Sequence, residues 1–169
     1  MAPPASRIYD VCGDLLGAVV AHHGGSLPAR AYVSGGPPAW DCELLATWCE
    51  NTVGIDGNVA QEQQQPLTRH AGHTMRAGTF VVTLVRCTPA LPDTEGDQIV
   101  LPSVAEEQAA ARTLYEDGQR VLNALVAAEK AGELAGCNSV VFQSWGTLGP
   151  EGGLVAGELR VRVGLATGL

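Results

Sequence analysis

Apolar residues recur along this chain at two different spacings, which divide it into helices and strands. Near the N-terminus they follow steps of three and four residues, the spacing of one helical face: Ile8, Cys12, Leu15 and Val19. We expect this helix to begin after Ser6, a residue type that caps helix starts, and to run to about His23. Gly24 and Gly25 follow and end it, because glycine readily adopts the left-handed conformation of a helix end.

A second, longer helix is predicted after residue 103. Ser103 and Glu106 form a capping box, in which each side chain can bond the other's backbone N–H. The apolar face continues from there to about Glu133 and contains Leu114, Val121, Leu125 and Ala128. Gly118 should weaken the middle of this helix by up to ~1 kcal/mol relative to alanine.

Three strands are expected between the helices. Residues 30–34 form a short one, and residues 79–87 are β-branched and apolar on both faces. Residues 42–53 are ambiguous, because their apolar positions suit either a strand with two buried faces or a helix. We favour the strand.

The last third of the chain predicts a β-hairpin. Residues 138–145 form one arm, residues 146–153 contain the turn, and residues 154–165 form the other arm. In the last arm, apolar residues alternate with Arg160 and Arg162, which is typical of a half-buried strand. The order of elements predicts an α+β fold in one domain, residues 1–169: an antiparallel or mixed sheet of about five strands with two main helices packed on it.

Two long segments without periodicity interrupt this pattern, and long loops in compact domains are usually functional. We expect partner contacts in residues 54–78 and 88–102. The candidates in the first segment are Gln63, Leu67, His70 and Met75. The second segment is acidic and contains Asp93, Glu95 and Asp97.

The net charge of −8 narrows the range of functions. It argues against a phosphate-binding surface, since nucleic-acid affinity comes largely from Lys and Arg. No apolar stretch approaches the ~20 residues of a membrane span, and the N-terminus lacks the order of a signal peptide. We therefore expect synthesis and retention in the cytoplasm.

The cysteines and histidines give no pattern of a chemical site. The five cysteines are odd in number and widely spaced, so we expect small buried apolar residues instead of disulfides. His22, His23, His70 and His73 lack zinc-site spacing and are expected at the surface. No Gly-x-Ser-x-Gly elbow or phosphate loop occurs. We predict no catalytic residue, metal or cofactor.

Several short motifs resemble one protein family. A Tyr-Val strand is followed by a Gly/Pro turn and by Trp40-Asp41-Cys42, a later strand ends in Arg86-Cys87, and a Gly-Pro-x-Gly-Gly hairpin spans residues 149–153. Together with the order of elements, these motifs resemble the tail terminator proteins of long-tailed phages that infect actinobacteria. Many members of that family carry a second Cys and a Gly-Gln soon after the Trp-Asp. This chain departs from the pattern, since it continues with Glu43-Leu44-Leu45.

The resemblance implies a ring, usually a hexamer, that sits on the tail tube and ends its polymerisation. Its partners would be copies of itself, the tail tube protein and a neck or stopper protein. DNA would pass without specific binding, with Asp93, Glu95 and Asp97 as candidate lumen lining. Arg160 and Arg162 are candidates for contacts between subunits. The alternatives are a head–tail adaptor or stopper, and a small cytosolic enzyme or ligand-binding domain.

Overall fold

The computed structural model describes residues 7–55, 75–88, 102–134, 137–151 and 153–165. Two helices and five strands follow one another in the predicted order. They are α1 (Arg7–His22), β1 (Arg30–Val33), β2 (Leu44–Ile55), β3 (Met75–Cys87), α2 (Val104–Ala131), β4 (Cys137–Glu151) and β5 (Leu154–Leu165).

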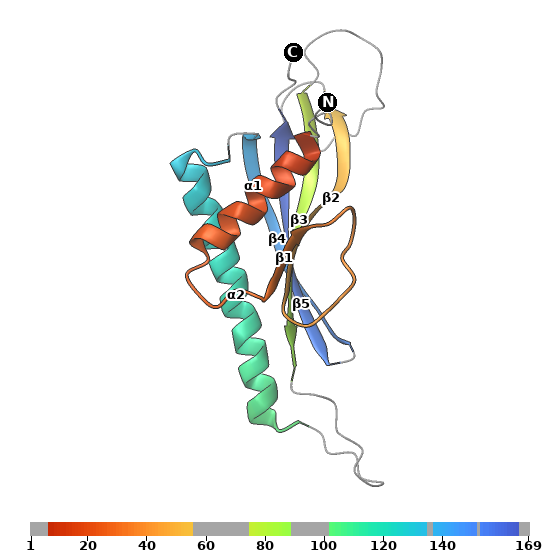
Figure 1. Ribbon diagram of the computed structural model, residues 1–169, viewed down its shortest axis with the longest axis vertical. Coiled ribbons are helices and arrows are strands. Elements are labelled where there is room, and N and C mark those ends of the chain that lie inside the picture. The colour runs from red at the N-terminus through yellow and green to blue at the C-terminus, as the bar shows by residue number, and fades with distance from the viewer. Residues whose placement is uncertain (1–6, 56–74, 89–101, 135–136, 152, 166–169) are drawn as a thin grey trace.

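All five strands lie in one sheet, in the order β1-β2-β3-β5-β4. The pair β1–β2 is parallel and the other three pairs are antiparallel, so the sheet is mixed. Both helices pack on the sheet (Figure 1), which confirms the predicted α+β class. The long strands β2, β3 and β5 form the centre of the sheet, and β1 and β4 flank them.

The main core lies between the helices and one face of the sheet. Alternate residues of β3 and β5 point into it, as the period of two along a strand requires. They meet the apolar faces of both helices in a single cluster that includes Val11, Leu15, Phe80, Val121 and Val161, all without exposed surface. Each of these side chains contributes about 1.5–3 kcal/mol by leaving water.

The opposite face of the sheet carries a smaller apolar cluster. Leu44, Ala46, Val85 and Ala156 are fully buried there, and Trp40 packs against them. The strands β2 and β3 are therefore buried on both faces, as their unbroken apolar runs predicted. The strand assignment of residues 42–53 was correct.

The ends of α2 also follow the prediction. The Glu106 carboxylate accepts a hydrogen bond from the Ser103 backbone N–H at 2.8 Å, and the Ser103 hydroxyl accepts one from the Glu106 N–H. Gly132 closes the helix in the left-handed conformation with φ of 73°. Neither helix in the described part of the chain is long and apolar enough to cross a membrane.

Two strands are longer than their side-chain patterns predicted, and one is shifted. The strand β2 lies two residues later than predicted, at Leu44–Ile55, and β3 begins four residues earlier, at Met75. Ile55 pairs with Met75, so the predicted loop 54–78 is shorter. The strand β4 continues through the predicted turn region to Glu151, which pairs with Leu154. Backbone pairing with a long neighbour extends a strand whatever its side chains are, so periodicity alone did not give these bounds.

Gly118 has a role that the sequence did not indicate. A Cβ atom at this position would lie 2.5 Å from the Trp145 indole, and one at Gly157 would lie 2.0 Å from it. The indole thus lies between two glycines, one on α2 and one on β5. Gly118 is therefore expected to weaken α2, but it allows the close packing of Trp145 against this helix, which a residue with a side chain would block.

We predict opposite effects for two glycine-to-alanine changes inside helices. Gly118→Ala should lower the free energy of unfolding by about 1–3 kcal/mol, because the added methyl group displaces Trp145. Gly17→Ala on α1, where no atom lies within 4 Å of the added Cβ, should raise it by up to ~1 kcal/mol. Urea unfolding measures both. A stabilised Gly118→Ala variant would contradict the packing described here.

Candidate functional site

A group of ionisable side chains lies beside the apolar core, where four segments of the chain meet. We call this group the ionic junction and define it as His23, Glu43, Arg86, Asp117 and Arg120. Its members come from the segment just after α1, the residue before β2, the end of β3 and the middle of α2. Positions far apart in the sequence are therefore joined here by charge.

Arg86 is the centre of the ionic junction. Its Nε donates to the Asp117 carboxylate at 2.8 Å, and one terminal nitrogen donates to the Ser26 carbonyl oxygen at 2.7 Å. The other terminal nitrogen donates to the Glu43 carboxylate. A planar guanidinium suits this role because its donors point in fixed directions.

Asp117 is fully buried and is held by cations on two sides. Besides Arg86, the Arg120 guanidinium lies 3.5 Å from its second oxygen. Burial lowers the pKa of Arg86, but the hydrogen bonds and charges of Asp117 and Glu43 outweigh this and hold it above its ordinary value. Arg86 therefore stays cationic, and removing Asp117 would leave this charge buried and uncompensated.

His23 lies against this pair and is buried, with 3% of its surface exposed. Its Nε2 lies 3.7 Å from the Asp117 carboxylate. Burial lowers the pKa of His23 and outweighs the attraction of Asp117, while Arg120 and Arg86 lower it further. The expectation of a surface histidine was wrong here, because the His23 backbone N–H bonds to Val19 at 2.9 Å, which places His23 one helical turn beyond this buried residue and on the same face. His22 is exposed as expected and pairs with Glu133 at 2.7 Å.

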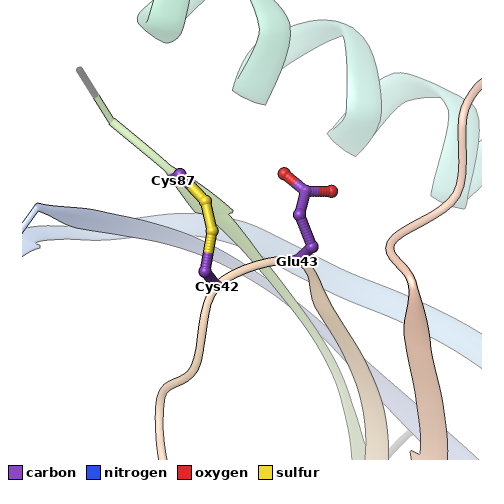
Figure 2. A group of neighbouring side chains, drawn as sticks. All are labelled: Cys42, Glu43 and Cys87. Atoms are coloured by element: carbon purple, nitrogen blue, oxygen red, sulfur yellow. A yellow bond between two sulfur atoms is a disulfide. The ribbon is translucent and has the colours of Figure 1, made fainter. Parts of the chain in front are cut away.

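Cys42 and Cys87 form a disulfide beside the ionic junction (Figure 2). Their Cα atoms are 5.1 Å apart. Leu44 pairs with Val85 in an antiparallel register, so the residues two places beyond on each strand face each other. The expectation of buried, unpaired cysteines was wrong for these two. Closing a loop of 45 residues restricts the unfolded chain by about 4 kcal/mol in the chain-entropy account.

Glu43 lies between the disulfide and the ionic junction. Its φ of 56° is in the left-handed region, which is unusual for a residue other than glycine. The ion pair with Arg86 holds this conformation. The two sulfurs and the Glu43 carboxylate lie within 4.8 Å of one another, a spacing that could hold a metal ion. In the structure the sulfurs are bonded to each other and the carboxylate accepts from Arg86.

The other three cysteines are free thiols. Burial, and then the charge of Cys49, raise the pKa of Cys12 to about 12. Burial, the largest cause, raises the pKa of Cys137 to about 11, and it also raises that of Cys49. All three therefore stay protonated at neutral pH, whereas a nucleophile or a metal ligand must be a thiolate.

The motif before β2 has a structural role at each position. Trp40 packs on the smaller apolar cluster. The Asp41 carboxylate pairs with Arg30 and accepts the Cys42 backbone N–H at 2.8 Å. Cys42 then bonds to Cys87, which follows Arg86. Two motifs that lie more than 40 residues apart in the sequence are thus one unit in space.

The remaining predicted site residues are distributed differently. Gln63, Leu67, His70 and the acidic Asp93, Glu95 and Asp97 lie outside the described residues. Met75 was expected in a loop, but it is the first residue of the strand β3. Arg160 lies near Glu50 and Glu158 of its own chain, at 3.4 and 3.3 Å. Arg162, opposite Val141, has no ion pair within 4.0 Å in the described part of the chain.

Sequence reasoning missed the ionic junction, although one signal was present. Asp117 is three residues after Leu114 and four before Val121, so it lies on the apolar face of α2. A single carboxylate at such a position predicts a buried ion pair. The sequence alone does not say which cation pairs with it.

We predict that Asp117→Asn lowers the free energy of unfolding by about 3–5 kcal/mol, because it leaves Arg86 buried without a full counter-charge. Glu116→Gln is the matched control, since the neighbouring Glu116 carboxylate is exposed and pairs with Arg112 and with the half-exposed Arg120, but not with the buried Arg86. It should change stability little. Denaturant unfolding compares the two variants. Equal losses in their free energies of unfolding would show that the buried ion pair stabilises the fold no more than an exposed one.

We predict a pH dependence that comes from His23. The unfolded chain gains a proton at this residue as the pH falls below about 6.5, while the folded chain resists it. This contribution to stability is therefore complete above pH ~6.5 and is lost progressively below it. The slope of stability between pH 7 and pH 5, measured by denaturant unfolding at each pH, should be smaller in His23→Gln than in the native chain. An equal slope in the two chains would refute this.

Comparison of the chain with protein-family models and with curated proteins gave no match. The site consists of a covalent link, the disulfide between Cys42 and Cys87, and an ionic link centred on Arg86. Together they join both helices to the central strands.

Proposed function

We propose that this chain is the tail terminator subunit of a long-tailed phage. In this proposal copies of the chain form a ring, with six as the expected number. The ring caps the tail tube, ends its polymerisation and offers a surface to the neck, while DNA passes through its lumen. The role is structural and involves no catalysis.

The observation that carries this proposal is the convergence of the family-like motifs. Trp40, Asp41 and Cys42 lie beside Arg86 and Cys87, joined by the disulfide. Motifs that serve a common structural purpose are expected to meet in the fold. Here they fasten the start of β2 to the end of β3.

The chemistry of the site favours a structural role over catalysis. The charged groups of the ionic junction are directed at one another, and Asp117 and Arg86 are mostly buried. The free thiols are protonated at neutral pH. A catalytic group must instead reach a substrate in a suitable protonation state. A network of this kind supports the rigid core that a subunit of an assembly needs.

The charge of the chain supports a conduit for DNA. A net charge of −8 per subunit gives the assembled ring a strongly negative potential. Such a ring would not retain DNA, because retention depends on cationic contacts with phosphates. DNA could then leave the particle without release from the wall.

We predict that the chain, added to polymerising tail tube protein, gives tubes that end in a six-fold ring of this subunit. Replacing residues 60–68 with a Gly/Ser linker of equal length should abolish capping but leave the unfolding free energy nearly unchanged, because it removes contacts and not loop length. Electron microscopy of tube ends measures both effects. A single copy at the tube end, or normal capping by the linker variant, would contradict the proposal.

A further inference from the structure

The strand β4 forms one edge of the sheet and is unusually open. It pairs with β5 on one side, and no described strand pairs with its other side. It runs for 15 residues, from Cys137 to Glu151. Such an edge presents a row of backbone N–H and C=O groups that can pair with another strand.

The two edges of the sheet differ in a way that makes β4 the pairing edge. The opposite edge strand, β1, has only four residues and begins with Arg30. Short length and charge are the usual means by which proteins protect a sheet edge. In contrast, β4 has no charged residue from Cys137 to Pro150. Two of its apolar side chains are exposed, Val141 to 47% and Leu148 to 41%.

The absence of charge on β4 indicates what kind of partner it fits. Two copies of a chain with a net charge of −8 repel each other, and the repulsion is least where the contact itself is uncharged. A basic partner would find no carboxylate along this edge before Glu151. A second β4 strand is uncharged over the same length and satisfies this condition.

We propose that two copies of this chain associate through β4, antiparallel and with Trp145 at the two-fold axis. Between Ser139 and Leu148, β4 contains one extra residue, Gln143, at a register shift between Phe142 and Ser144. Counted without this residue, the strand positions on the two sides of Trp145 correspond. Val141 then faces Leu148 of the second copy, Phe142 faces Thr147, and Ser144 faces Gly146.

This register places matching side chains opposite each other. Val141 and Leu148 both lie on the face of the sheet away from the helices, because they pair with Arg162 and Ala156 of β5. The two exposed apolar residues of the strand would thus cover each other twice in the dimer. Cross-strand contacts of this kind are the main source of side-chain stabilisation between neighbouring strands.

On the helix side, the same register places Trp145 of both copies next to the axis. The Trp145 indole is turned inward over Gly157 and toward Gly118, away from the open edge. A groove of about 330 Å³ lies beside it, between α2 and β4, and Tyr115, Gln119 and Phe142 are among its walls. The Thr147 side chain of the second copy, opposite Phe142, faces this groove.

The dimer goes beyond the proposed function and does not depend on it. A two-fold contact uses the same surface on both copies and is complete with two subunits, whereas a ring needs two different surfaces. The dimer is therefore a state of the free chain.

Sedimentation equilibrium of the chain with its disulfide intact tests the proposal by measuring the mass as a function of concentration. The native chain should approach twice 17.5 kDa. Val141→Lys/Leu148→Lys places like charges opposite each other twice and should raise the dissociation constant at least about tenfold. Val141→Lys/Leu148→Glu places opposite charges at the same positions and should restore the dimer. Val20→Lys, a change at an equally exposed apolar residue on α1 (46%), should leave the mass unchanged.

Each other result overturns the proposal. A native chain that stays at 17.5 kDa, or that reaches six times this mass, rules out the two-fold dimer. If Val20→Lys dissociates the dimer as strongly as the β4 variants, the contact is not at β4. If the Lys/Glu variant is no better than the Lys/Lys variant, the register is wrong. Circular dichroism of each variant verifies that it is folded. The proposed ring is tested by microscopy of tube ends, so a negative result there is distinguishable from a negative result for the dimer.

Discussion

The ion pair between Arg86 and Asp117 is the interaction on which the arrangement of this fold depends. The apolar core is not directional, and it would tolerate α2 at several positions along the sheet. A buried carboxylate restricts the position of α2 much more strongly, because an unpaired charge in the core costs several kcal/mol. Asp117 must therefore meet Arg86, and this sets the position of α2 along β3.

The same guanidinium sets the position of two further segments. Its bond to the Ser26 carbonyl holds the turn after α1, and its bond to Glu43 holds the start of β2. The disulfide between Cys42 and Cys87 makes the second link covalent. One side chain thus relates both helices to the sheet, and this explains why the sequence motifs around residues 40–43 and 86–87 occur together.

The ends and edges of the sheet have different physical characters. The end at the ionic junction is fastened by charge and by a disulfide. The edge at β4 has no charged residue before Glu151 and is unpaired in the described residues. A rigid interior with an open strand edge is suited to an assembly subunit, whose contacts with other chains lie on its surface. The proposed function and the proposed dimer concern different surfaces of the same molecule.

Local features of the sequence determined the elements and their order. The capping box and Gly132 gave the ends of α2, alternation gave β5 from Leu154 to Leu165, and the apolar runs gave two strands buried on both faces. These features depend on residues close in sequence, so a pattern can reveal them. Tertiary structure alone decided the length of β4, the pairing of Cys42 with Cys87, the burial of His23 and the contact that requires Gly118. Each of these depends on which distant residue lies opposite, and a register between strands or a helix position is set by the whole fold.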